Sequence, residues 1–182
     1  MPCAAVDRVT VGVRSGPEGT LRLCYSLEGE VARLRIPLPE TPRRTDGLWQ
    51  HTCFEAFAMA EGVPGYYEFN FSPSSQWAGY RFHGYRAGGV AIEPAPPPAI
   101  AVAARDSGRI RLDVALSLEG LLELRQAARL RLALAAVIEE KNGLLSYWAL
   151  THPAPRPDFH HADAFAVVFE RSGVLEDWYH RL

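Results

Sequence analysis

The sequence predicts an all-β fold, an antiparallel β-sandwich with few short helices, and two observations support this prediction. Apolar and polar residues alternate in short runs from Val9 to Phe169, which is the period of half-buried strands. Glycine and proline, with 15 and 14 residues, separate these runs as turn residues do. The length of 182 residues suits one domain, which we expect over residues 1–173, followed by a C-terminal tail at 174–182.

The first half of the chain contains four such runs. Three of them are TLRLCYSL at 20–27, VARLRIPL at 31–38 and HTCFEAFAM at 51–59. The fourth, YYEFNFS at 66–72, has the clearest alternation. Because side chains alternate along a strand, we expect Tyr67 and Phe69 on one face of it, and Glu68 and Asn70 on the other.

The second half follows a proline-rich connector at 93–99, which we expect to be extended. Its runs are RIRLDVAL at 109–116, RLRLALAAVIEE at 129–140, LLSYWAL at 144–150 and DAFAVVFE at 163–170. A short helix is expected at 118–128 with Ser117 as its N-cap, although Gly120 disfavours a helix. The set of runs therefore predicts ten or more strands and at most one or two short helices.

Composition and charge exclude several classes of partner. The net charge is −2, so no basic field argues for nucleic acid. No run of about 18 apolar residues predicts a membrane span, and the N-terminus lacks the pattern of a signal peptide. Cys3, Cys24 and Cys53 are widely spaced, which fits reduced thiols better than a disulfide framework. We therefore expect a cytoplasmic protein; its oligomeric state is left open.

Three segments combine aromatic and short polar side chains at expected strand ends, where the binding sites of β-sandwiches form. Indole rings cover the apolar face of a sugar ring, while carboxylates and amides hydrogen-bond its hydroxyl groups. This composition favours a sugar as the small-molecule ligand. The candidate ligand-binding residues are Trp49, His51, Glu55, Glu68, Asn70, Trp77, Tyr80, Trp148, His152, Asp158, His160 and His161.

Three motifs carry a resemblance to a known family: LWQHTCFEAF at 48–57, YYEFNFSPSSQWAGYRF at 66–82 and YWALTHPAPRPDFHHADAF at 147–165. Together they resemble the bacterial branch of the DOMON-like superfamily, which is related to the family 9 carbohydrate-binding modules. The resemblance covers roughly residues 6–170. It implies a β-sandwich that binds a small molecule, since characterised relatives bind either sugars or haem.

The resemblance also indicates which residues would act. In the sugar-binding relatives, aromatic rings enclose a terminal sugar, a role open here to Trp49, Trp77 and Trp148. In the haem-binding relatives, a methionine and a histidine hold the iron. Met59 is one of two methionines, and no histidine evidently pairs with it, so haem is the weaker implication and no cofactor is expected.

Each candidate also has a purely structural interpretation. Trp148 lies inside an expected strand and is the indole most expected in the core, whereas Trp49 and Trp77 stand at strand ends. Glu55 and Glu68 need partners inside apolar strands, unless they face solvent or a ligand. The candidate partners are Arg81, Arg111, Arg129 and Arg131.

Residues 151–165 hold His152, His160 and His161, which are half of the six histidines. Prolines at 153, 155 and 157 have no backbone N–H to donate, so this segment cannot form regular strand pairing and we expect an ordered loop. The histidines either pin the loop by hydrogen bonds, contact the ligand or bind a metal. Asp158 and Asp163 are expected to cap the loop or to accept from the histidines.

The sequence thus favours a non-catalytic domain that binds a small ligand, with a carbohydrate first. One alternative is a haem-binding module. Another is a metal-dependent enzyme that uses the Pro/His-rich loop, with His51, His152, His160 or His161 beside Glu55. The shared-pocket hypothesis is that five residues meet at one end of the sandwich: Trp49, His51, Trp77, His152 and His160.

Overall fold

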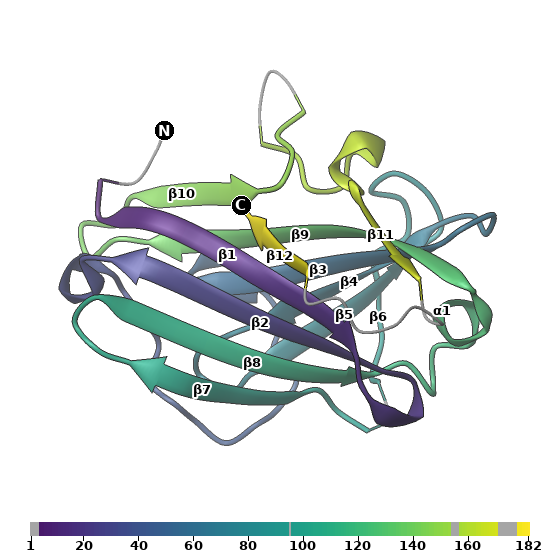
Figure 1. Ribbon diagram of the computed structural model, residues 1–182, viewed down its shortest axis with the longest axis horizontal. Helices are drawn as coiled ribbons and strands as arrows, with labels where there is room; N and C mark the ends of the chain where they lie inside the picture. The colour runs from purple at the N-terminus through teal and green to yellow at the C-terminus, as the bar shows by residue number, and fades with distance from the viewer. Residues whose placement is uncertain (1–3, 95, 154–156, 171–177) are drawn as a thin grey trace.

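The computed structural model is a sandwich of two antiparallel sheets, which confirms the predicted all-β fold (Figure 1). It describes residues 4–94, 96–153, 157–170 and 178–182, and twelve strands lie within these residues. The smaller sheet has the order β12-β1-β2-β8-β7. The larger sheet has the order β10-β9-β3-β4-β5-β6, and β11 also pairs with β9.

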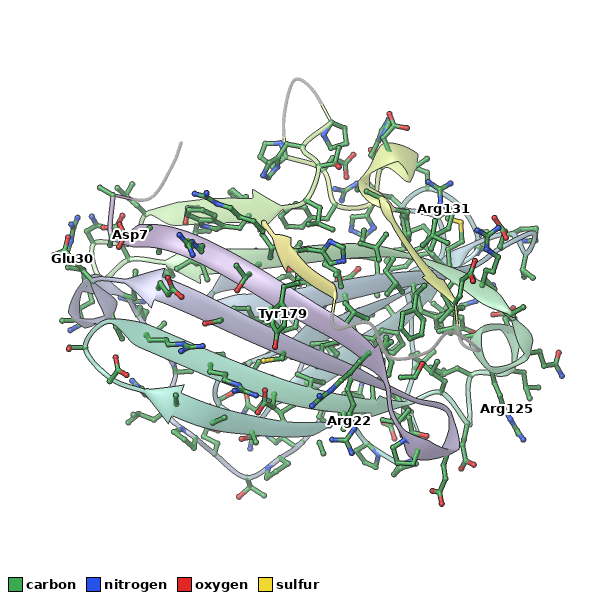
Figure 2. The ribbon with its side chains drawn as sticks, viewed as in Figure 1. Asp7, Arg22, Glu30, Arg125, Arg131 and Tyr179 are labelled. Carbon is green, nitrogen blue, oxygen red and sulfur yellow. The ribbon has the colours of Figure 1, made fainter. Side chains whose placement is uncertain are left out.

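The smaller sheet contains strands from both ends of the chain. Its members are β1 (Val6–Ser15), β2 (Thr20–Gly29), β7 (Ala99–Arg105), β8 (Arg109–Ser117) and β12 (Trp178–Arg181). Residues 178–181, which we expected in a tail, form the edge strand β12 against β1. Gly12 stands opposite Tyr179 in this pairing, and a Cβ at Gly12 would lie 3.0 Å from the tyrosine ring. Figure 2 shows Tyr179 lying over β1 on the outside of the molecule.

The larger sheet is built around β9, which has strand partners on both sides. Its members are β3 (Cys53–Ala60), β4 (Tyr66–Phe71), β5 (Trp77–Phe82), β6 (Val90–Ala91), β9 (Arg129–Glu139), β10 (Leu145–Ala149) and β11 (Val167–Glu170). β9 is long enough for β10 to pair with its last residues and β11 with its first, along the same edge. Its other edge pairs with β3 along the whole length of that strand.

The larger sheet is buried on both faces. Its inner face packs against the smaller sheet through Phe54, Phe69 and Leu134, which belong to the main core. On the outer face, Phe57 and Tyr66 belong to a second apolar cluster that also contains Phe159 and Phe165, and we call this the outer cluster. Because both faces of the sheet are covered, every residue of β4 is buried.

Helices are few, as the sequence predicts. Helix α1 (Leu122–Gln126) is shorter than the expected 118–128, because Leu121 rather than Ser117 is its N-cap. The Ser117 hydroxyl instead accepts a hydrogen bond from the Glu119 N–H in the preceding turn. Single 3₁₀ turns are η1 (Pro17–Gly19), η2 (Val31–Arg33), η3 (Leu48–Gln50) and η4 (Ala162–Ala164). Within the described residues, no helix has the length and apolar character that crossing a membrane requires.

Candidate functional site

A large groove lies on the outer face of the larger sheet and has a volume of about 1260 Å³. The chain before β3 forms one wall, the sheet forms the floor, and the loop at 157–160 closes part of the other wall. Its lining residues include Arg35, Glu40, Asp46, Trp49, His51, Glu55, Glu68, Gln76, Tyr80, Arg86, Tyr147, Phe159 and His160. Segments distant in the sequence therefore meet in one concave surface.

Two aromatic side chains line the groove while remaining largely open to solvent. Trp49 lies in turn η3 and is 50% exposed, and Tyr147 of β10 is 44% exposed. Gly47 stands before η3 with φ of 76°, a left-handed conformation that favours glycine and turns the chain toward the sheet. Exposed aromatic rings in a concave surface are suited to stacking against a ligand.

The floor of the groove carries two buried carboxyl groups on neighbouring strands. Glu55 of β3 and Glu68 of β4 both line the groove and are 3% and 6% exposed. Asn70 stands opposite Glu55 in the strand register, and its Nδ2 donates to Glu68 Oε1 over 2.8 Å. Glu55 Oε1 has no hydrogen-bond partner among the described residues. Glu68 is therefore held in place by Asn70, whereas Glu55 has an unsatisfied hydrogen-bond acceptor.

Burial dominates the ionisation of these two groups. It raises the pKa of Glu55 well above its usual range, and the nearby charge of Glu68 adds to the effect. Burial also raises the pKa of Glu68, while the hydrogen bond from Asn70 and the charge of Arg86 act in the opposite direction. The buried thiol of Cys53, next to them on β3, has a raised pKa for the same reason. Burial in the floor consequently favours the protonated, neutral form of each carboxyl group.

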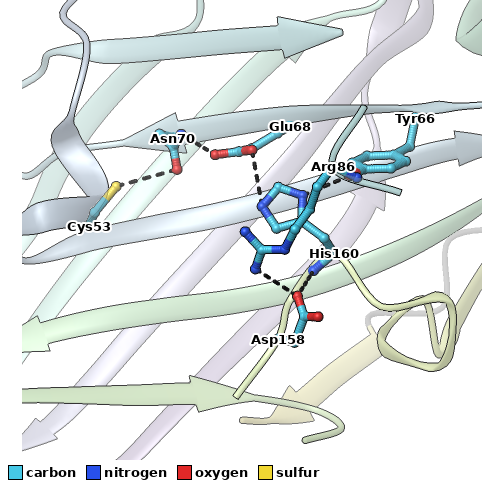
Figure 3. A network of polar contacts seen from close by, with 7 residues as sticks. All are labelled: Cys53, Tyr66, Glu68, Asn70, Arg86, Asp158 and His160. Carbon is cyan, nitrogen blue, oxygen red and sulfur yellow. Dashed lines mark hydrogen bonds and ion pairs between the residues drawn. The ribbon is translucent and has the colours of Figure 1, made fainter. Parts of the chain in front are cut away.

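His160 joins the floor to the loop through a chain of hydrogen bonds (Figure 3). The Arg86 N–H donates to the Tyr66 hydroxyl over 3.1 Å, and this hydroxyl lies 2.8 Å from His160 Nδ1. Because the hydroxyl oxygen accepts from Arg86, its hydrogen is free to point at Nδ1. His160 then carries its proton on Nε2, which faces Glu68 Oε2 at 3.7 Å.

Burial and the nearby charge of Arg86 lower the pKa of His160 to about 4. The contact between His160 and Glu68 is therefore not an ion pair at neutral pH, although the two groups lie close together. At 3.7 Å it is also too long for a direct hydrogen bond. The Nε2–H group is thus a donor that points toward Glu68 without a close acceptor.

Asp158 fixes the Pro/His-rich loop to the sheet. Its Oδ1 accepts from Arg86 Nη2 over 2.8 Å and from the His160 N–H over 3.1 Å, and its Oδ2 accepts from the Tyr85 hydroxyl. Arg86 has a φ of 51°, an uncommon backbone conformation outside glycine. The predicted role of Asp158 as a capping group for this loop matches these contacts.

The other acidic groups along the groove each have a basic partner. Glu139 Oε1 lies 3.1 Å from Arg35 Nη1, and its Oε2 lies 2.8 Å from His51 Nδ1. Asp46 pairs with Arg44 at 2.6 Å and accepts from the Tyr80 hydroxyl. The hydrogen bond to Asp46, together with burial as the larger cause, raises the pKa of Tyr80 to about 12.

Six of the twelve candidate residues line the groove: Trp49, His51, Glu55, Glu68, Tyr80 and His160. Two more support lining residues from behind, since Asn70 holds Glu68 and Asp158 holds Arg86. His152 is exposed, with its ring centre 6.4 Å from that of Phe159, and His161 Nδ1 accepts from the Asp163 N–H. Of the five residues in the shared-pocket hypothesis, the groove therefore brings together Trp49, His51 and His160 but not Trp77 or His152.

The tryptophans at 77 and 148 face the interior of the sandwich. Trp77 pairs with Phe71, a core residue, so its side chain projects from the same inner face. Trp148 packs against the main core, and its Nε1 donates to Ser146 Oγ over 3.0 Å. Neither indole lines the groove, because side chains on a strand alternate and their positions belong to the inner face.

Sequence reasoning missed several lining residues, notably Tyr147, Gln76 and Arg86. Tyr147 had a usable signal, since it precedes Trp148 and must project from the opposite face of the strand. Gln76 and Arg86 lie in turns, where no periodicity indicates the direction of a side chain. The four arginines considered as partners for Glu55 and Glu68 have other partners: Glu123 for Arg81, Asp113 for Arg111, Glu61 and Glu170 for Arg129, and the Phe165 carbonyl for Arg131.

The two alternative functions also name residues that the structure places. Among residues 4–94, 96–153, 157–170 and 178–182, no three histidine, cysteine or acidic side chains cluster as metal ligands would. Met59, the methionine considered for haem, packs partly buried against the outer cluster and does not line the groove. Cys24 and Cys53 are free thiols, and Cys3 lies outside the described residues.

Comparison with known proteins shows the fold. The structure is similar to the crystal structure of a "putative carbohydrate-binding protein" from Bacteroides uniformis, with a TM-score of 0.60 and 12% sequence identity. The similarity covers 85% of this chain and 74% of that chain. No family model matches the sequence, and no curated protein is similar enough in sequence to count as a match.

Proposed function

We propose that the groove on the larger sheet binds a carbohydrate and that the protein is a non-catalytic binding domain. The observation that carries this proposal is the pairing of two exposed aromatic rings, Trp49 and Tyr147, with buried polar groups in one groove. Aromatic rings stack on the apolar faces of sugars, and buried carboxyls select hydroxyl or amino groups because an unpaired buried polar group costs about 1–3 kcal/mol.

Two further points support a carbohydrate. The structural neighbour from Bacteroides uniformis bears a carbohydrate-binding description, and the sequence motifs around Glu55 and Glu68 resemble the DOMON-like superfamily. The volume of about 1260 Å³ exceeds the roughly 300–1,000 Å³ of pockets that hold one small ligand. We therefore favour an oligosaccharide over a single sugar unit.

The test is a glycan-array screen followed by calorimetric titration of the best oligosaccharide with wild type, Trp49→Ala and Tyr147→Ala. Each variant should bind about tenfold more weakly, because each loses a stacking surface. Each melting temperature should stay near that of wild type, since substitutions of exposed residues change stability by about 0.5 kcal/mol or less.

The matched control is Tyr179→Ala, which removes an aromatic side chain that is 67% exposed on the smaller sheet. This variant should bind as wild type does. The proposal fails if Trp49→Ala and Tyr147→Ala keep full affinity for every oligosaccharide that the wild type binds. It also fails if the wild type binds no sugar on the array.

A further inference from the structure

The acidic groups in and beside the groove differ in whether they have a basic partner. Glu139 pairs with Arg35 and His51, as described above, and two further acids have cation partners: Glu40 with Arg43 at 3.3 Å, and Asp158 with Arg86 at 2.8 Å. Glu55 and Glu68, on the floor, lack an arginine or lysine ion pair among the described residues. The two acids on the floor are therefore the two that lack an arginine or lysine partner among the described residues, whereas Glu139, which is just as buried at 5% exposed, has Arg35.

The charged and titratable groups that face this pair do not supply the missing charge. Arg86 lies close enough to influence Glu68, but its guanidinium is hydrogen-bonded to Asp158. His160 is neutral at ordinary pH, and its nearest nitrogen is 3.7 Å from Glu68. Other polar neighbours carry no positive charge either: the thiol of Cys53 and the hydroxyls of Tyr25, Tyr66 and Tyr80 have raised pKa values, and the amide of Asn70 donates to Glu68.

Glu55 supplies a second and independent observation. Glu55 lines the groove and is 3% exposed, and its Oε1 has no hydrogen-bond partner among the described residues. A buried acceptor without a donor costs free energy unless a ligand or water satisfies it. Glu55 and Glu68 are diagonal neighbours on adjacent strands and repel each other when both are ionised, so a single cation between them would relieve both penalties.

We propose that the ligand is a sugar with a protonated amino group, and that Glu55 and Glu68 form the subsite that holds this ammonium. The proposal rests on the proposed carbohydrate function and names the chemical class of the sugar. The ammonium donates to the free Oε1 of Glu55 and to Glu68 Oε2, while Asn70 keeps the Glu68 carboxyl oriented. Trp49 and Tyr147 then hold the rings of the sugar chain at the rims of the groove.

The experiment compares three series of oligosaccharides of equal length by calorimetric titration: glucosamine oligomers, their N-acetylated counterparts and glucose oligomers. The glucosamine series should bind wild type most tightly. Glu55→Gln and Glu68→Gln should each weaken its binding about tenfold to a hundredfold, as expected for the loss of a charge-assisted hydrogen bond. The same variants should change the affinity for glucose oligomers far less.

Proton release provides a readout that does not depend on a variant. Because burial raises the pKa of both acids, an ammonium that binds between them should lower these pKa values and release protons. The heat of binding should therefore change between buffers of different ionisation enthalpy, with protons released, and the affinity should rise with pH through the weakly acidic range. Dialysis against a chelator should leave binding unchanged.

Glu170→Gln is the matched control, because it removes an exposed carboxylate outside the groove that pairs with Arg129. It should bind all three series as wild type does. Equal or tighter binding of the N-acetylated or glucose series overturns the ammonium subsite while sugar binding stands. Loss of binding in chelator overturns it in favour of a metal ion. Failure of all three series, with none found on the array, counts against sugar binding itself.

Discussion

At the scale of single residues, the hydrogen bonds of His160 determine which ring nitrogen carries its proton. Tyr66 approaches Nδ1 and Glu68 faces Nε2, so we predict the neutral Nε2–H form from pH 8 to about pH 5. The lowered pKa of about 4, against an ordinary 6.5, means that the folded state resists protonation. The stability that follows is present above pH 6.5 and is lost as pH falls toward 4.

Long-range ¹H–¹⁵N NMR correlations of the histidine ring measure this form directly. Tyr66→Phe removes the donor to Nδ1 and should let the ring take up a proton at a higher pH. Tyr179→Phe, which removes a hydroxyl from the smaller sheet, should leave the His160 signals unchanged. A wild-type spectrum showing the proton on Nδ1 would contradict the hydrogen-bond chain.

Glu55 gives a second prediction at this scale, which concerns the free energy of unfolding. Its pKa in the folded protein lies well above the ordinary 4.5, so the folded state binds more protons than the unfolded state above that pH. Glu55 therefore lowers stability progressively as pH rises above 4.5. We expect Glu55→Gln to be more stable than wild type near neutral pH, with the difference shrinking as pH falls toward 4.

Urea unfolding at several pH values measures this difference, with Glu170→Gln as a control that removes an exposed carboxylate. An advantage for Glu55→Gln that is constant with pH would show that the buried charge is not its cause. If the ammonium subsite is right, the same variant gains stability and loses affinity, which is the usual relation between a strained site and its function.

The residue scale also shows where sequence patterns succeed and where they stop. Alternation along 66–72 correctly places Glu68 and Asn70 together, opposite Tyr67 and Phe69. It does not tell which face of β4 meets the smaller sheet, because both faces of the strand are buried. Trp77 illustrates the difficulty: its position at a strand end suggested ligand contact, but its pairing with Phe71 directs it inward.

At the scale of elements, the loop at 157–165 covers the outer cluster and forms part of the groove wall. Its attachment depends on Asp158, which accepts hydrogen bonds from Arg86, Tyr85 and the His160 backbone. Asp158→Ala should lower the free energy of unfolding by about 1–3 kcal/mol, because the donors lose their acceptor. Backbone hydrogen exchange should become faster at 157–165.

The control is Asp163→Ala in the same loop, because Asp163 is exposed and, among the described residues, its carboxylate has one ion-pair neighbour, His161 Nδ1 at 3.6 Å. That variant should exchange as wild type does, whereas an equal effect of the two substitutions would contradict a special role for Asp158. The proline content of this segment predicts an ordered loop, but not the partners that order it. Arg86 and Tyr85 lie over 70 residues earlier in the chain, beyond the reach of any local pattern.

At the scale of the whole molecule, the two-sheet architecture follows from the alternating runs, and the groove follows from how the connections cross the larger sheet. The runs of apolar residues identify seven of the twelve strands, namely β2, β3, β4, β8, β9, β10 and β11, but the run at 31–38, which we expected to be a strand, contains turn η2 and no strand. They do not identify β12, whose four residues are too few to show a period. They also do not predict the groove, because its walls are connecting segments whose course depends on tertiary contacts.

The pairing of β12 with β1 has a consequence for synthesis on the ribosome. β1 spans residues 6–15, and among the described residues its outer edge pairs with residues 178–181 and accepts a further hydrogen bond at Val9 from the Leu182 N–H. The backbone groups along that edge therefore stay unpaired while more than 160 intervening residues are translated. Until the final partner arrives, the nascent chain presents an open strand edge to other chains, which is a recognised route to aggregation. The time for which this edge needs protection is thus set by the rate of translation.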